Sequence, residues 1–283
     1  MFWEIWMRIR EKYGLRDRVK LFLIVLSLFL TVIGLFLLKK EYPQQMQKTA
    51  SIQRFLEISL QPVGKTMYIW GGGWDNEDST AGATSTHLGL SMQWETFARE
   101  QDASYNFEDH RFERENGLDC SGYVGWVIYN TFETENGLQG YVTASTDLAE
   151  SLANRGWGKL IHNPKEFLPG DIVSMEGHVW ICLGTCADGS VLLVHSSPPG
   201  VSVCGTTLPN VSETEESIAI QLATEFMNSY YPEWQEKYPR RNVSPSYLEN
   251  VSVFRWSTKV MLDAKEMQEF SGEEIIVYIS PDI

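Results

Sequence analysis

The pattern of hydrophobic and polar positions along the chain predicts helices and strands in mixed order, which is typical of an α+β fold. Apolar residues at helical spacing predict helices near 52–60, 92–99, 145–154 and 218–227. Short runs rich in β-branched and aromatic residues predict strands at 172–175, 178–184, 191–195, 201–204 and 253–256. Turn-forming Gly, Pro, Asn and Asp residues separate most of these segments, so the pattern indicates closely connected elements.

Two of the predicted strands form a hairpin with a histidine near each free end. His178–Gly184 is the first strand, Cys186–Gly189 supplies the turn, and Val191–His195 is the return strand. Because side chains alternate along a strand, this turn puts His178 and His195 on the same face, offset by one or two residue pairs. A single strand histidine is more often structural, but two that converge favour a functional site.

A cysteine stands at the start of another predicted helix. In the segment Gly117–Gly122, Asp119 is a suitable N-cap residue, so Cys120 falls in the first helical turn. The positive end of the helix dipole favours a thiolate there, and the thiolate is the nucleophilic form of cysteine. The alternative is a small buried side chain without a chemical role. We expect a nucleophile, because Cys120 lies outside the apolar stripe made by Val124, Val127 and Ile128.

A run of three glycines follows an aromatic, strand-like segment. Met67–Trp70 leads into Gly71–Gly73, and glycine lets another backbone or a ligand approach closely. The alternative is a flexible turn.

The amino-terminal residues predict a membrane anchor. Residues 21–38 are an uninterrupted apolar run that is long enough to span a bilayer as a helix. The basic segment 1–20 precedes it, which predicts a cytoplasmic amino terminus and an extracytoplasmic remainder. A cleaved signal peptide is the alternative, but small residues at a cleavage site are missing after residue 38. Residues 39–50 read as a polar tether.

Charge and cysteine content narrow the function classes. The net charge is −14, and the first forty residues carry eight basic and three acidic side chains, or +5, which leaves −19 on the remainder. An acidic surface argues against nucleic-acid binding. Four cysteines are too few for a disulfide scaffold in a chain of this length, although one pair could form among Cys182, Cys186 and Cys204.

The order of the chemical groups, a helix cysteine followed by strand histidines, matches the Cys–His–X arrangement of papain-like enzymes. His178 would act as general base toward Cys120 and later protonate the leaving amine, while His195 would orient the imidazole. Backbone amides near Cys120 could stabilise the oxyanion.

Four segments, in this order, resemble the NlpC-type bacterial cell-wall cysteine peptidases. They are Val63–Lys65 with Tyr68–Gly72, Asp119–Gly122, Pro169–Ile172 with Gly177–Val179, and Val194–Ser196. The resemblance covers roughly residues 50–205. It implies a papain-like fold, with an antiparallel sheet packed against the helix that carries the nucleophile. It also implies the catalytic residues Cys120, His178 and His195, and the substrate-binding candidates are Tyr68, Trp70, Asp119 and Ser121.

Enzymes of this family cleave peptidoglycan stem peptides, commonly at the D-γ-glutamyl bond to a diamino acid, and use no metal or other cofactor. The resemblance therefore predicts a thiol peptidase whose partners are peptidoglycan peptides and, through one amino-terminal helix, the cell membrane, with no nucleic acid. An amidase or transacylase with the same triad is an alternative. A catalytically silent wall-binding or division-complex module is another, which the intact triad disfavours.

The expected domain is residues 51–206, with an insertion at 75–116 and a carboxyl-terminal extension at 207–283 packed on it. The insertion is long for a connection inside a compact domain, and the resemblance implies that its two ends lie beside Cys120. We expect either a cap that narrows substrate choice or a surface elaboration without effect on selection.

Overall fold

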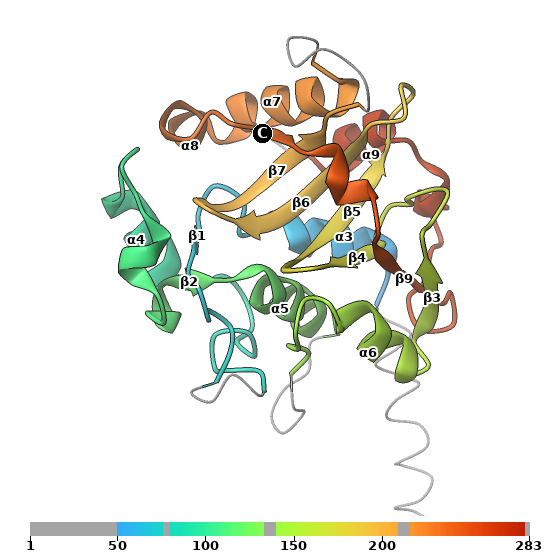
Figure 1. Ribbon diagram of the computed structural model, residues 1–283, viewed down its shortest axis with the longest axis horizontal. Coiled ribbons are helices and arrows are strands. Elements are labelled where there is room, and N and C mark those ends of the chain that lie inside the picture. Colours follow the sequence, from blue (N-terminus) through green and yellow to red (C-terminus); the bar gives the residue numbers. More distant parts are fainter. Residues whose placement is uncertain (1–49, 76–79, 133–139, 209–215, 281–283) are drawn as a thin grey trace, which may run out of the picture. The chain divides into compact units, whose positions relative to one another are not determined.

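A curled mixed β-sheet flanked by helices forms the centre of the computed structural model (Figure 1). The structure describes residues 50–75, 80–132, 140–208 and 216–280. All of them belong to one compact unit.

The sheet has the strand order β2-β1-β7-β6-β5-β4-β9-β3, and β8 pairs with β7. The strands are β1 (Met67–Tyr68), β2 (Gly117–Leu118), β3 (Gly158–His162), β4 (Ile172–Met175), β5 (His178–Thr185), β6 (Val191–Ser197), β7 (Gly200–Thr206), β8 (Asn242–Val243) and β9 (Ser252–Trp256).

This topology corrects the expected fold class, because the sheet is mixed rather than antiparallel. The pairs from β4 to β7 are antiparallel, but β1 runs parallel to β2 and β7 runs parallel to β8. Parallel strands need a long connection. The segment 69–116 supplies one between β1 and β2, and residues 207–241 supply the other. The connections that make the sheet mixed therefore run through the predicted insertion and the start of the carboxyl-terminal extension.

The membrane helix of the expected fold class has no counterpart among the described helices. Among the described residues, no helix is both long enough and apolar enough to cross a bilayer. The most completely buried helix, α5 (Cys120–Phe132), has 13 residues, against about 20 needed for a span. The predicted span at 21–38 and the basic segment at 1–20 lie outside the described residues.

The α-helices bury their apolar residues against one face of the sheet, whereas Tyr247 and Leu248 of a 3-10 helix pack against the other. Helix α5 packs against β5 and β6 and against α3, and α7 lies along β7. Besides α5, the helices are α3 (Ile52–Leu60), α4 (Met92–Glu100), α6 (Leu148–Asn154), α7 (Ile218–Tyr230), α8 (Pro232–Lys237) and α9 (Gly272–Ile279). Short 3-10 helices span Phe107–His110, Arg114–Asn116, Pro245–Leu248 and Met267–Glu269.

The predicted hairpin is confirmed. Ile181 pairs with Val194 and Cys182 with Leu193, so His178 and His195 share a face at the open end. A register shift between Cys182 and Gly184 interrupts the pairing nearer the turn. The pairing on the histidine side of this bulge keeps the register that the turn position predicted.

The carboxyl-terminal residues complete the sheet rather than only covering it. Strand β9 lies between β4 and β3 and pairs with both. The buried carboxylate of Asp171 accepts hydrogen bonds from Arg255 Nε at 2.9 Å and Nη2 at 2.8 Å. Asp171 directly precedes β4 and Arg255 is in β9, so this ion pair ties the two strands together.

Candidate active site

The amino terminus of α5 is held by its cap residue. The carboxylate of Asp119 accepts hydrogen bonds from Gly122 N at 2.7 Å, Ser121 Oγ at 2.9 Å and Gly71 N at 3.2 Å. Gly122 N is one of the free N–H groups of the first helical turn, which otherwise have no partner in the helix. Cys120 is therefore fixed as the first residue of α5, as its sequence context predicts.

The triple glycine packs against this first turn. A Cβ atom on Gly73 would lie 2.4 Å from Gly122 Cα, and one on Gly122 would lie 2.0 Å from Gly72 O. Neither distance is sterically possible. The loop and the helix can approach this closely only because the residues at their contact, Gly72, Gly73 and Gly122, have no side chains. The close-approach interpretation of the glycine run is confirmed.

Ser121, one of the predicted substrate-binding residues, is fully engaged in this local network. Its hydroxyl donates to Asp119 and accepts a hydrogen bond from Trp74 Nε1 at 3.0 Å. Asp119 and Ser121 are both buried. Their visible role is to fix the helix start and to tie residue 74 to it.

The two histidines contact each other directly. His178 Nε2 lies 3.0 Å from His195 Nδ1, within hydrogen-bond distance. His195 is buried, with 3% of its surface exposed, and His178 is partly buried. If His178 donates its Nε2–H to His195, its own Nδ1 remains available as a base.

Cys120 lies beside the strand that begins with His178. Backbone N–H groups of Val179 and Ser121 act on its sulfur to lower the pKa of the thiol. Within the described residues, no hydrogen bond joins Cys120 to either histidine. The structure therefore brings the predicted nucleophile next to β5, while the two imidazoles form the one direct contact within the predicted triad.

The protonation states differ from the expectation of a stabilised thiolate. Burial, followed by the charge of Asp119, raises the pKa of Cys120 to about 12. Burial lowers the pKa of His178 to about 4. It also holds the pKa of His195 well below its usual value, with further lowering from the charges of His178 and Arg241. The helix dipole does not outweigh desolvation, so the thiol and both imidazoles are neutral at pH 7.

The two aromatic candidates before the glycine run lie in different environments. Tyr68 is buried, and its pKa is raised by burial and then by the charges of Cys120 and Asp119, which places its hydroxyl in their field. Trp70 is 44% exposed and carries the guanidinium of Arg111 at 5.1 Å from its ring centroid. Tyr68 belongs to the site, whereas Trp70 forms a surface contact with the insertion.

Sequence reasoning missed Tyr247, in the 3-10 helix Pro245–Leu248. Its ring centroid lies 5.4 Å from that of His178 and 6.0 Å from that of His195, so it packs over the histidine pair. A tyrosine in a polar segment beyond the resembling region carries no signal in the sequence. It reaches the site because residues 242–256 return to the sheet.

A cavity of about 610 Å³ reaches the site on the side of His195. Its wall includes His195 and Tyr247, together with Tyr105 and Phe107 of the insertion. The Tyr105 hydroxyl donates to Tyr68 O at 2.7 Å, and Phe107 packs edge-on against the Tyr68 ring. The insertion thus supports Tyr68 and forms part of the cavity wall.

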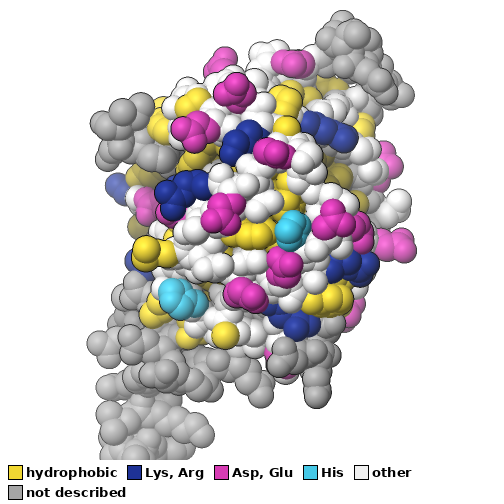
Figure 2. All heavy atoms as spheres, turned by 90° about the vertical axis from the view of Figure 1, so that its left-hand side faces the viewer, with side chains coloured by type: hydrophobic (Ala, Val, Ile, Leu, Met, Phe, Trp, Pro, Cys, Tyr) yellow, Lys and Arg dark blue, Asp and Glu magenta, His cyan; other side chains and the backbone are white. Residues whose placement is uncertain are grey.

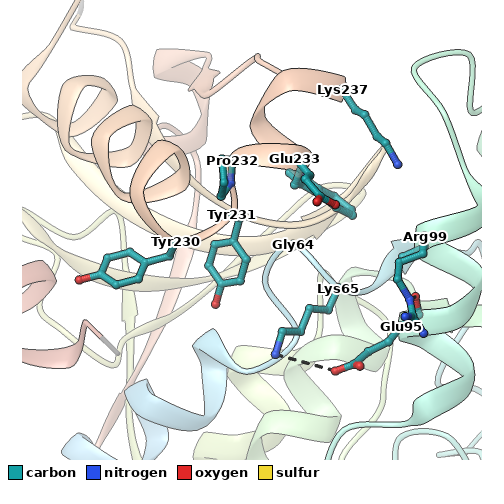
Figure 3. Close-up of a pocket in the computed structure, with 11 residues that line it drawn as sticks. Gly64, Lys65, Glu95, Arg99, Tyr230, Tyr231, Pro232, Glu233 and Lys237 are labelled. Carbon is teal, nitrogen blue, oxygen red and sulfur yellow. Dashed lines mark hydrogen bonds and ion pairs between the residues drawn. The ribbon is translucent and has the colours of Figure 1, made fainter. Parts of the chain in front are cut away.

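A second cavity, of about 420 Å³, lies between α4 and the α7–α8 region (Figure 3). Lys65 and Glu95 form an ion pair of 3.8 Å across it, and Tyr231 and Trp234 contribute aromatic surface. None of the predicted site residues lines it.

The four cysteines are all free and buried, so Cys182, Cys186 and Cys204 form no disulfide.

Comparison with known proteins found no matching family model, no matching curated protein and no matching solved structure.

Proposed function

We propose that the protein is a cysteine peptidase that hydrolyses the stem peptides of peptidoglycan through Cys120, His178 and His195. The observation that carries the proposal is the 3.0 Å contact between His178 and His195 on the strand pair that passes the Cys120 thiol. A base held by a second polar residue, next to a helix-capped cysteine, is the arrangement that thiol hydrolases require.

In the proposed reaction the neutral thiol is activated during attack. His178 accepts the Cys120 proton as the sulfur adds to the peptide carbonyl, and His195 holds His178 through the Nε2–Nδ1 contact. The protonated His178 then gives this proton to the leaving amine, and a thioester to Cys120 remains. Water, deprotonated by His178, attacks the thioester and releases the carboxylic acid and the free thiol.

Backbone N–H groups at the helix start are the candidate oxyanion donors. Those of Cys120 and Ser121 already interact with the sulfur. Negative charge that develops beside the sulfur would meet the same fixed donors, together with the positive end of α5. Because Asp119 and the glycine loop fix this turn, the donors need little reorganisation during the reaction.

The substrate assignment rests on the four segments that resemble NlpC-type peptidases. Three of them form the helix start and the two histidine strands of the site. We propose the D-γ-glutamyl bond to the diamino acid as the bond cleaved, and the outer side of the cytoplasmic membrane as the place of action. Tyr68 is the proposed substrate contact beside the thiol.

The test is the mass of the products. The full chain is incubated with purified peptidoglycan and with soluble stem peptides, and products are identified by mass spectrometry. We expect fragments that end in D-glutamate and fragments that begin with the diamino acid, and none with Cys120→Ala. Cleavage at another peptide bond would correct the specificity, and intact peptides under all conditions would contradict the proposed activity.

A further inference from the structure

The cavity beside His195 is positively charged. Its lining residues, all among those that the structure describes, include three cationic side chains and no Asp or Glu: Lys237, Arg240 and Arg241. The whole chain has a net charge of −14. A cavity whose charged lining residues are all cationic, in so acidic a protein, is complementary to an anionic ligand.

Arg241 is the most unusual of the three. It is 3% exposed, and one of its terminal nitrogens, Nη2, donates to Tyr238 O. Its Nε and Nη1 are buried without a hydrogen-bond partner. Burying a guanidinium whose N–H donors lack partners and whose charge is unpaired lowers the stability of the fold, unless an anion binds to it.

No acidic residue that the structure describes pairs with Arg241. Cys204 lies near enough for its charge to act on Arg241, but burial raises the pKa of that thiol and keeps it neutral. Arg241 therefore has no counter-charge among the described residues.

Other parts of the molecule balance their charges differently. In the cavity of Figure 3, Lys65 pairs with Glu95, and Glu233 also lines the wall. Acidic and basic side chains are likewise intermingled on the face shown in Figure 2. The arrangement around Arg241 is thus a local feature and does not reflect a generally basic surface.

The position of this cavity indicates what the anion belongs to. His195 and Tyr247 line it, and both contact His178, so a ligand in the cavity lies next to the proposed catalytic base. A carboxylate is the anionic group that a peptide substrate carries, and it pairs well with guanidinium donors.

We propose that Arg241 binds a free carboxylate of the peptide substrate in this cavity, and so selects peptides that carry one. The inference rests on the proposed function and adds a specificity-determining residue to it. This residue comes from the carboxyl-terminal extension, outside the region that resembles the NlpC-type peptidases.

The test measures binding without turnover. Titration calorimetry on full-length Cys120→Ala compares N-acetyl-L-alanyl-γ-D-glutamyl-L-lysyl-D-alanine carrying free carboxylates with the same peptide carrying both carboxylates as amides. We expect the amidated peptide to bind at least about tenfold more weakly, because it cannot make a charge-assisted bond to Arg241. Adding Arg241→Gln should remove most of this difference.

Arg240→Gln is the matched control. Arg240 is exposed and its Nε already donates to Asn242 Oδ1 at 3.3 Å, so its removal should change the preference by no more than about threefold. Thermal unfolding of each variant shows whether it is folded. The amidation comparison needs no change at Arg241, so it remains decisive if Arg241→Gln does not fold.

Equal affinity for the two peptides, a preference that survives Arg241→Gln, or no binding of the carboxylate peptide would each overturn the inference. Hydrolysis by the wild-type chain is measured separately. If both peptides are cleaved and bound equally well, only the carboxylate site is wrong. If neither is cleaved but an Arg241-dependent preference is found, the anion site stands and the proposed peptidase activity is wrong.

Discussion

His178 Nε2 lies 3.0 Å from His195 Nδ1, and the ring of Tyr247 packs against both imidazoles. A hydrogen bond between two neutral histidines requires one ring to donate and the other to accept. If His195 accepts, the Nδ1 atom of His178 is left without a proton and can serve as a base. The contact therefore fixes the orientation of the proposed base, and with His195 as the acceptor it also sets the tautomer of His178.

This relationship predicts different outcomes for two substitutions of His195. An asparagine can place an amide oxygen near the former Nδ1 position and still accept from His178, whereas alanine leaves that donor without a partner. We expect His195→Ala to lower kcat by roughly five- to 150-fold, which corresponds to about 1–3 kcal/mol, and His195→Asn to lose clearly less. Stem-peptide hydrolysis rates measure this, and equal rates for wild type and His195→Ala would remove the orienting role.

The raised pKa of Cys120 predicts its alkylation behaviour. With a pKa of about 12, the thiolate fraction rises about tenfold per pH unit over the neutral and mildly alkaline range. Iodoacetamide labelling of Cys120, followed by peptide mass mapping, should therefore accelerate from pH 7 to pH 10 without a plateau. The urea-unfolded chain is the control, because its thiols titrate near about 8.5. A plateau below pH 8 in the native protein would indicate a stable thiolate instead.

Gly73 and Gly156 form a matched pair for the close approach of the glycine loop to α5. Both have a positive φ, +95° and +75°, but a Cβ on Gly73 meets Gly122 Cα at 2.4 Å, whereas nothing lies within 4 Å of one on Gly156. We expect Gly156→Ala to cost about 1–2 kcal/mol of backbone strain, and Gly73→Ala to cost a further 1–3 kcal/mol, approximately, for overpacking. Chemical denaturation measures both, and equal losses would show that the loop can move away from the helix.

The ion pair between β4 and β9 predicts a loss of stability on removal of Asp171. Asp171 is fully buried, and its substitution by Asn leaves Arg255 without its closest carboxylate, at a cost of about 3 kcal/mol. Glu166 contacts the same arginine at 3.3 Å, but its side chain is 68% exposed. Glu166→Gln is therefore the control and should cost about 1 kcal/mol or less in the same denaturation experiment. Similar losses for the two variants would mean that burial does not strengthen the Asp171 pair.

Local patterns predicted much of the fold. The helix that starts at Cys120, the hairpin and its register at the histidine end follow from capping, side-chain alternation and turn position, which depend on nearby residues. The glycine run also indicated a close approach, which Gly72 and Gly73 make against Gly122.

Long-range pairing was beyond the same reasoning. The parallel partners β1–β2 and β7–β8, and the position of β9 between β4 and β3, depend on contacts between residues far apart in the sequence. The protonation state of Cys120 was predicted wrongly, because its burial by neighbouring elements outweighs the helix dipole. Tyr247 and Arg241 were missed for a related reason, since only the folded chain brings residues 241–247 to His195.

The central claim is that Cys120 is the nucleophile, and the most direct measurement is the rate of stem-peptide hydrolysis by Cys120→Ala. Cys186→Ala is the matched control, because Cys186 is also a free buried thiol, at 4% exposure against 7% for Cys120. With both variants shown to be folded by thermal unfolding, we expect Cys120→Ala to lose at least about 10³-fold in rate, and Cys186→Ala to stay near wild type. Hydrolysis by Cys120→Ala at the wild-type rate would contradict the account.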